Sequence, residues 1–254
     1  MSMKKVVVLI CLFLSSFGFA QNEQLFSEAT EYYNNGEYSK AIENYGKIVQ
    51  NGQHSAALYF NMGNCYYKLN SIGPSIYYYE KALLLKPNDS EILNNLGYAQ
   101  NMRLDAIEEI PKTELSKIYN GTIGLFTCDQ WAYLAVGLVL FFILMYLAYF
   151  FLRSANQKRI AFISSFFALG LGLLCILLAY LQQQQYKKDD PAIVFSKEVK
   201  VTSEPNNNSE AVFTLHEGTK VNVLEELDGW EKIRIADGQT GWLLAENVRK
   251  LKDF

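Results

Sequence analysis

Positions 131–152 carry the sequence WAYLAVGLVLFFILMYLAYFFL, and positions 160–181 carry IAFISSFFALGLGLLCILLAYL. An α-helix over either stretch would be ~33 Å long at about 1.5 Å per residue, which matches a hydrocarbon core of roughly 30 Å. Neither stretch contains a charged residue, and Trp131, Tyr133 and Tyr180 lie near stretch ends, where aromatic rings favour the headgroup zone. The pair predicts a transmembrane hairpin around the basic loop RSANQKR at 153–159.

The basic loop also predicts the orientation of the hairpin. Short loops rich in Lys and Arg stay cytoplasmic, so the parts before and after the hairpin are expected together on the outer side. Neither span carries the intramembrane charges that mark transport routes, so the hairpin is interpreted as an anchor. Ser164, Ala168 and Gly172 recur every four residues, and this small-residue stripe is expected to face the first span or another protein.

The first residues have the pattern of a signal peptide. Lys4 and Lys5 precede an apolar stretch at 6–17, and Gly18 and Ala20 are the small residues before a cut at Gln21. The alternative is a third transmembrane helix, but its apolar core would be short for a span.

Composition argues against several classes of function. A formal net charge of −3 and a pI near 5.6 provide no basic surface for nucleic acid. Cys11 lies in the leader and Cys175 in the second span, which leaves Cys65 and Cys128 without metal-ligand spacing. These two either form a pair or are isolated small apolar residues.

A repeat precedes the hairpin. Ala29, Gly63 and Gly97 follow one another at intervals of 34 residues, and Ala41/Ser75 and Tyr45/Tyr79 keep the same interval. With turn residues at Gly36 and Asn70 and a closing Pro87, the segment resembles two tetratricopeptide repeats followed by one capping helix. The resemblance implies about five helices in a short superhelix, with a concave groove that binds a peptide or protein.

The repeat register assigns aromatic, amide and cationic side chains to that groove. The candidate protein-binding residues are Phe26, Tyr33, Phe60, Asn64, Tyr67, Lys68, Asn94, Tyr98 and Asn101. Asn64 and Lys68 resemble part of a clamp for a terminal carboxylate, although the other cations of such a clamp are missing. The alternative is that these are solvated surface residues.

Short β-type segments with turn residues between them follow the hairpin. The predicted strands are 192–195, 199–202, 211–215, 220–224, 230–235 and 242–244, which suggests a small barrel. Their motif order, with Glu217-Gly218, Gly229-Trp230 and Gly241-Trp242, resembles the bacterial SH3-like domain. Alternation places Trp230, Lys232 and Arg234 on the outer face as a candidate ligand platform, or else Trp230 covers a barrel end. Trp242 is expected in the core.

The predicted fold class is thus a multidomain membrane protein with an all-α tetratricopeptide superhelix, a two-helix transmembrane hairpin and an all-β SH3-like barrel. The predicted segments are a signal peptide (1–20), the repeat region (21–104), a juxtamembrane linker (105–130), helix 1 (131–152), a cytoplasmic loop (153–159), helix 2 (160–181), a linker (182–191) and the SH3-like domain (192–254). The juxtamembrane linker either lies along the membrane surface or is simply packed.

This segment order resembles the Bat aerotolerance group of bacterial envelope proteins. The resemblance implies an inner-membrane location with both outer modules in the periplasm, membrane partners that carry von Willebrand factor A domains, and a link to oxidative or envelope stress. His54 and His216 lie in no recognisable catalytic or metal motif, so no enzyme activity, catalytic residue, metal or cofactor is expected. Three hypotheses follow: an envelope scaffold, a module that binds peptidoglycan or peptides, and a sensor subunit that signals through a partner.

Overall fold

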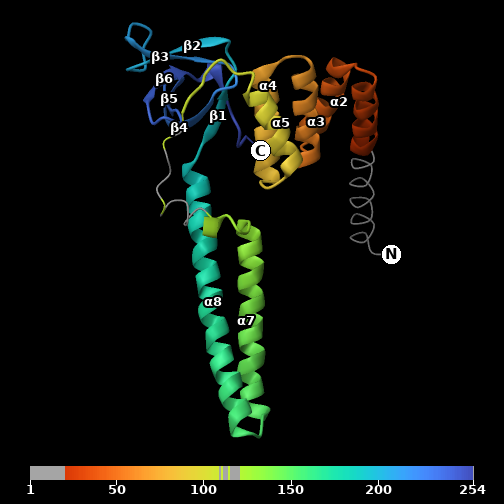
Figure 1. Cartoon of the computed structure of the whole chain (residues 1–254), viewed down its shortest axis with the longest axis vertical. Coiled ribbons are helices and arrows are strands. Elements are labelled where there is room, and N and C mark those ends of the chain that lie inside the picture. The colour runs from red at the N-terminus through yellow and green to blue at the C-terminus, as the bar shows by residue number, and fades with distance from the viewer. Residues whose placement is uncertain (1–20, 109, 111–113, 115–120, 254) are drawn as a thin grey trace, which may run out of the picture. The chain divides into compact units, whose positions relative to one another are not determined.

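The structure, a computed structural model, describes residues 21–108, 110, 114 and 121–253 (Figure 1). The signal-peptide prediction for residues 1–20 lies outside them. The described residues of 1–109 and 190–254 form one compact unit, and those of 110–189 form a second. Helical repeats, an apolar helical hairpin and an antiparallel sheet are all present, so the predicted fold class is confirmed.

Helices build the N-terminal part of the first unit. Described residues 21–34 are helical, and α2 (Tyr38–Gln50), α3 (Ala56–Lys68), α4 (Ile72–Leu85) and α5 (Ser90–Gln100) follow. Gly36 and Asn70 have the left-handed φ angles of 79° and 57° that their turns require. Ser55 and Asp89 cap α3 and α5 by accepting hydrogen bonds from backbone N–H groups. Helix α5 lies where the sequence predicted one capping helix.

Close packing between helices explains the 34-residue interval. A Cβ on Gly63 would lie 2.6 Å from the Tyr79 ring, so only glycine lets α3 approach α4 here. Ser75 is fully buried and its hydroxyl donates to the Gly63 carbonyl at 3.0 Å. Tyr45 is buried at the position equivalent to Tyr79 in the preceding repeat. Small residues and tyrosines at these positions therefore form the core of the array.

The second unit is dominated by two apolar helices, α7 (Cys128–Phe151) and α8 (Ala155–Lys188), which pack side by side (Figure 1). Both are long and apolar enough to cross a membrane, and most of their apolar surface is exposed. That exposure distinguishes them from the core helices of a soluble domain. The buried side of α8 carries Ala161, Ser165, Ala168, Gly172 and Cys175. A Cβ on Gly172 would lie 3.6 Å from the Leu138 side chain, so the small-residue stripe faces α7.

The helices extend beyond the apolar stretches. Helix α8 begins at Ala155, which places Lys158 and Arg159 in its first turns, and it continues to Lys188 through most of the expected linker 182–191. Hydropathy marks only the apolar part of each helix, whereas glutamines and lysines are good helix formers and let the helix continue. Helix α7 begins at Cys128, where Thr127 and Gln130 form a capping box.

The described residues just before α7 pack against the hairpin. The Trp131 indole donates a hydrogen bond to the Ile123 carbonyl at 3.1 Å, and the Gln182 amide donates to the Phe126 carbonyl at 3.1 Å. Ile123 is buried. This part of the juxtamembrane segment is therefore a packed linker.

Seven antiparallel strands form the barrel: β1 (Pro191–Val194), β2 (Glu198–Thr202), β3 (Ala211–His216), β4 (Lys220–Leu227), β5 (Trp230–Arg234), β6 (Thr240–Leu244) and β7 (Val248–Lys250). Their order in the sheet is β3-β2-β6-β5-β4-β1-β7. The sequence predicted the first six and missed β7, which is too short to show alternation. Val201, Ile233 and Leu243 are buried in the barrel core.

The barrel and the repeats share buried side chains. Ile193 of β1 and Leu251 after β7 are fully buried within the core cluster of the repeats. Gly218, with a left-handed φ of 84°, approaches α4 so closely that a Cβ would lie 2.8 Å from the Ile76 side chain. The two modules are thus one compact unit.

Candidate binding sites

A hollow of about 480 Å³ lies over α3, α4 and α5. It is lined by Tyr33, Phe60, Asn61, Asn64, Tyr67, Lys68, Tyr79, Glu91, Asn95 and Tyr98. We call this the α3–α5 groove. Its walls combine aromatic rings, three amides and one charge of each sign.

Asn64 has the most defined orientation in the groove. Its Oδ1 accepts a hydrogen bond from the Tyr79 hydroxyl at 2.6 Å and another from Asn95 Nδ2 at 2.9 Å. These two bonds fix the side chain and occupy its acceptor. Among the described residues, no hydrogen bond uses the Nδ2 of Asn64 or the Oδ1 of Asn95, which leaves one amide donor and one amide acceptor for a ligand.

Burial shapes the chemistry of the tyrosines here. It raises the pKa of Tyr79 and of Tyr33, so both stay neutral hydroxyls at physiological pH. Lys68 is exposed at the groove and has no salt bridge within the described part of the chain. The groove therefore offers neutral hydrogen-bonding groups, one cation in Lys68 and one carboxylate in Glu91.

Six of the nine predicted groove residues line this hollow: Tyr33, Phe60, Asn64, Tyr67, Lys68 and Tyr98. Phe26 lines a separate, shallower hollow on the first helix, while Asn94 and Asn101 are exposed and line neither hollow. The sequence reasoning missed Asn61 and Asn95, which lie 34 residues apart. That repeated amide was the signal that could have found them.

The candidate platform on the barrel is on the outer face of β5. Trp230 and Lys232 are partly buried and Arg234 is exposed, whereas Glu231 and Ile233 between them are buried. Lys232 Nζ lies 5.7 Å from the centre of the Trp242 ring, opposite it on β6. Trp242 is only 7% exposed and is one of the buried hydrophobic residues, so its expected burial in the core is confirmed.

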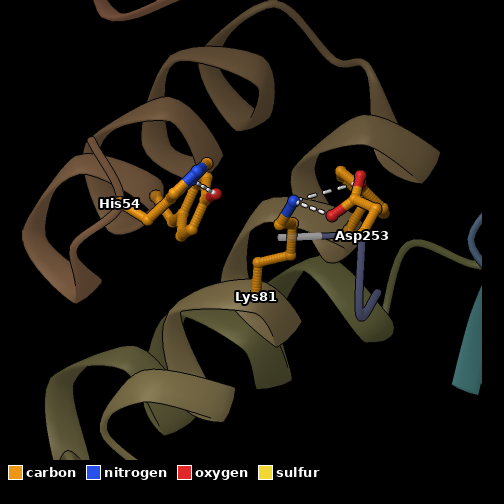
Figure 2. A network of polar contacts seen from close by, with 5 residues as sticks. His54, Lys81 and Asp253 are labelled. Atoms are coloured by element: carbon orange, nitrogen blue, oxygen red, sulfur yellow. Dashed lines mark hydrogen bonds and ion pairs between the residues drawn. The ribbon is translucent and has the colours of Figure 1, made fainter. Parts of the chain in front are cut away.

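A buried cation lies where the barrel meets α4 (Figure 2). The Lys81 side chain is only 5% exposed, and its ammonium pairs with Asp253. It also lies 4.8 Å from the centre of the Tyr59 ring and 5.3 Å from that of Tyr77. The Tyr77 hydroxyl donates to the second carboxylate oxygen of Asp253 at 2.8 Å. Burial alone would raise the pKa of Asp253, but hydrogen bonds from Lys81 and Tyr77 outweigh it, so the pKa is lowered.

A second polar contact ties the segment after α5 to the barrel. Asp105 accepts hydrogen bonds from the backbone N–H of His216 at 2.7 Å and from the Thr219 hydroxyl at 2.5 Å, and it pairs with His216 Nδ1 at 2.6 Å. Burial opposes ionisation of Asp105, yet these bonds lower its pKa. His54 contacts the Tyr59 hydroxyl (Figure 2). Both histidines thus have structural partners, and Cys65, Cys128 and Cys175 are free thiols.

Two segments of the chain match known families. Residues 56–89 match the family described as tetratricopeptide repeat, and residues 197–249 match the bacterial SH3 domain. The comparisons thus find one tetratricopeptide repeat within the predicted repeat region and a bacterial SH3 domain within the predicted barrel. No curated protein matches the chain at a significant level. Domains of these two families typically bind other molecules without catalysis, which fits a protein-interaction or envelope-binding role.

Proposed function

We propose that the chain is a non-enzymatic scaffold, anchored in the bacterial inner membrane, that holds partner proteins through an extended segment bound in the α3–α5 groove. The observation that carries this proposal is the orientation of Asn64. Its fixed amide donor, together with the Asn95 acceptor, matches the alternating C=O and N–H groups of an extended peptide backbone.

The rest of the groove supports a peptide over a small metabolite. The rings of Phe60, Tyr67 and Tyr98 provide apolar contact area in the same groove as the amides, and Tyr98 is 62% exposed. Exposed aromatic side chains beside fixed polar groups are typical of protein-binding surfaces. Lys68 adds a preference for a ligand with an acidic group near one end of the bound segment.

The hairpin supports the proposed location. Helices α7 and α8 anchor the chain, and the basic residues at their turn are expected in the cytoplasm, so the repeats and the barrel face the periplasm. The resemblance to the Bat group adds partners with von Willebrand factor A domains, in a BatE-like role linked to oxidative or envelope stress.

The groove is tested by crosslinking in intact cells followed by mass spectrometry. Replacing Asn64 and Asn95 together with Ala removes both groups that face a ligand and should weaken partner capture about 30-fold, at roughly 1 kcal/mol for each of the two lost hydrogen bonds. Asn94→Ala is the matched control, since Asn94 is the exposed neighbour outside the groove. An unchanged partner list in the double variant would refute binding through the groove.

The proposed topology is tested separately with an impermeant thiol reagent on cells that carry Cys128→Ser. A cysteine in place of Ser209, in the β2–β3 loop, should react from outside, whereas one in place of Ser154, in the hairpin turn, should not. The opposite labelling pattern would place both modules in the cytoplasm.

A second function is favoured by the outer face of the barrel. Partly buried Trp230 and Lys232, with exposed Arg234 on the same strand, form an aromatic and cationic surface that could contact cell-wall material or peptides. The full chain in detergent should then sediment with purified peptidoglycan, and Trp230→Ala should reduce the sedimented fraction. Failure of the unaltered chain to sediment would remove this function.

A further inference from the structure

The turn of the hairpin carries a hollow of about 450 Å³ between α7 and α8. It is lined by Tyr149, Ala155, Lys158, Arg159, Phe162 and Ile163. The five α8 residues recur at the spacing of one helix face, so a single surface of α8 meets Tyr149 of α7. We propose that this hollow binds the headgroup of an anionic phospholipid. The inference rests on the proposal that the hairpin spans a membrane.

Charge is the first argument. The sequence contains no Asp or Glu between Asp129 and Asp189, so the basic residues Arg153, Lys158 and Arg159 have no acidic neighbour along the hairpin. None of the three forms an ion pair with any residue in the described part of the chain. At the other end of α8, Lys187 and Lys188 are followed directly by Asp189 and Asp190. Of the two ends of the described hairpin, the turn is therefore the one with an uncompensated positive charge.

The polar and apolar walls of the hollow together favour a lipid over free phosphate. Lys158 Nζ lies 5.6 Å from the centre of the Tyr149 ring, so the cation is held beside the hollow. One helical turn further along α8, Phe162 and Ile163 form an apolar wall, and the Phe162 ring lies 5.9 Å from that of Tyr149. A phosphodiester would contact the cations while the start of its acyl chains contacts the apolar wall. Free phosphate has no apolar part that could contact Phe162 and Ile163.

Native mass spectrometry of the full chain in detergent tests the proposal. The chain should retain phosphatidylglycerol in preference to phosphatidylcholine. Lys158→Gln with Arg159→Gln should weaken retention about 25-fold, since each basic side chain near an anionic surface contributes roughly fivefold in affinity. Lys187→Gln with Lys188→Gln removes the same charge from the other end of α8 and should change nothing. The charge-conserving pair Lys158→Arg with Arg159→Lys should bind as the unaltered chain does, and circular dichroism confirms that each variant keeps its helices.

Three results would overturn the lipid assignment: equal retention of the two lipids, full retention by the Lys158/Arg159 double Gln variant, or displacement of the lipid by excess inorganic phosphate, which would indicate a free-phosphate site. Extraction of the chain from cell membranes with alkaline carbonate tests the spanning hairpin independently. Release of the chain by carbonate would refute the membrane anchor. Lipid selectivity is measured in detergent, so its outcome does not depend on the result of the carbonate extraction.

Discussion

The ion pair between Lys81 and Asp253 predicts that the stability of the first unit depends strongly on the partly exposed carboxylate of Asp253. Asp253→Asn keeps the size of the side chain but removes its charge, while the Lys81 side chain, which is 5% exposed, keeps its charge beside two tyrosine rings. Breaking a fully buried pair costs about 3–5 kcal/mol, whereas surface pairs contribute roughly 0–1 kcal/mol. Because Asp253 is 49% exposed and partly solvated, we expect a loss of about 2 kcal/mol.

Thermal unfolding of the full chain in mild detergent measures this loss. At roughly 2–4 °C per kcal/mol for a unit of this size, the melting temperature should fall by about 4–8 °C. Lys81→Met in the same chain removes the buried cation and replaces it with an apolar side chain of similar length. The double variant should therefore be more stable than Asp253→Asn alone.

The pH dependence gives an independent check. The pKa of Asp253 is lowered in the folded state, so its contribution is present above the unfolded value of about 3.9 and is lost as pH falls through the folded value. The gap between the unaltered chain and Asp253→Asn should be full at pH 7 and close below about pH 4. Equal stabilities of the unaltered chain and Asp253→Asn at pH 7 would refute the reasoning. So would stability losses of Lys81→Met and Asp253→Asn that simply add in the double variant.

Gly63→Ala should destabilise the array by about 1–3 kcal/mol, since its Cβ would lie 2.6 Å from the Tyr79 ring. Gly97→Ala, at the equivalent position with open space, should be neutral or slightly stabilising; equal losses in thermal unfolding would contradict the packing argument. Burial raises the pKa of Glu231, and its Oε2 has no hydrogen-bond partner among the described residues, so its charge costs stability as pH rises through the folded pKa. Glu231→Gln should therefore raise the barrel's unfolding free energy by about 1 kcal/mol at neutral pH and by nothing below about pH 4, while exposed Glu225→Gln should do neither.

Much of the fold could be predicted from local sequence because short-range patterns set it. The repeat interval fixed the positions of Gly63 and Tyr79, whose contact defines how α3 meets α4. Hydropathy identified α7 and α8 but not the residues at which they end. In α8, helical hydrogen bonding continues past the apolar stretch into Gln and Lys residues, which hydropathy does not mark. Alternation found the outer face of β5.

The site could be predicted only in part. The repeat register gave Asn64, but the orientation of its amide depends on Tyr79 and Asn95, which come from two other helices. The contact between the modules had no sequence signal at all. Lys81 looks like an ordinary helical lysine, and its burial depends on Asp253, which lies far along the chain after the whole barrel.

Helix α4 contacts both α3, next to the groove, and the barrel, and it does so through different faces. Tyr79 and Ser75 face α3 and support the groove, whereas Ile76, Tyr77 and Lys81 face the barrel. A short repeat array needs its end covered, since each repeat buries its apolar face only against a neighbour. Here Ile193 and Leu251 of the barrel complete the core of the repeats. The barrel thereby acts as a cap for the array, which explains how so few helices can hold Asn64 and Tyr79 in a fixed arrangement.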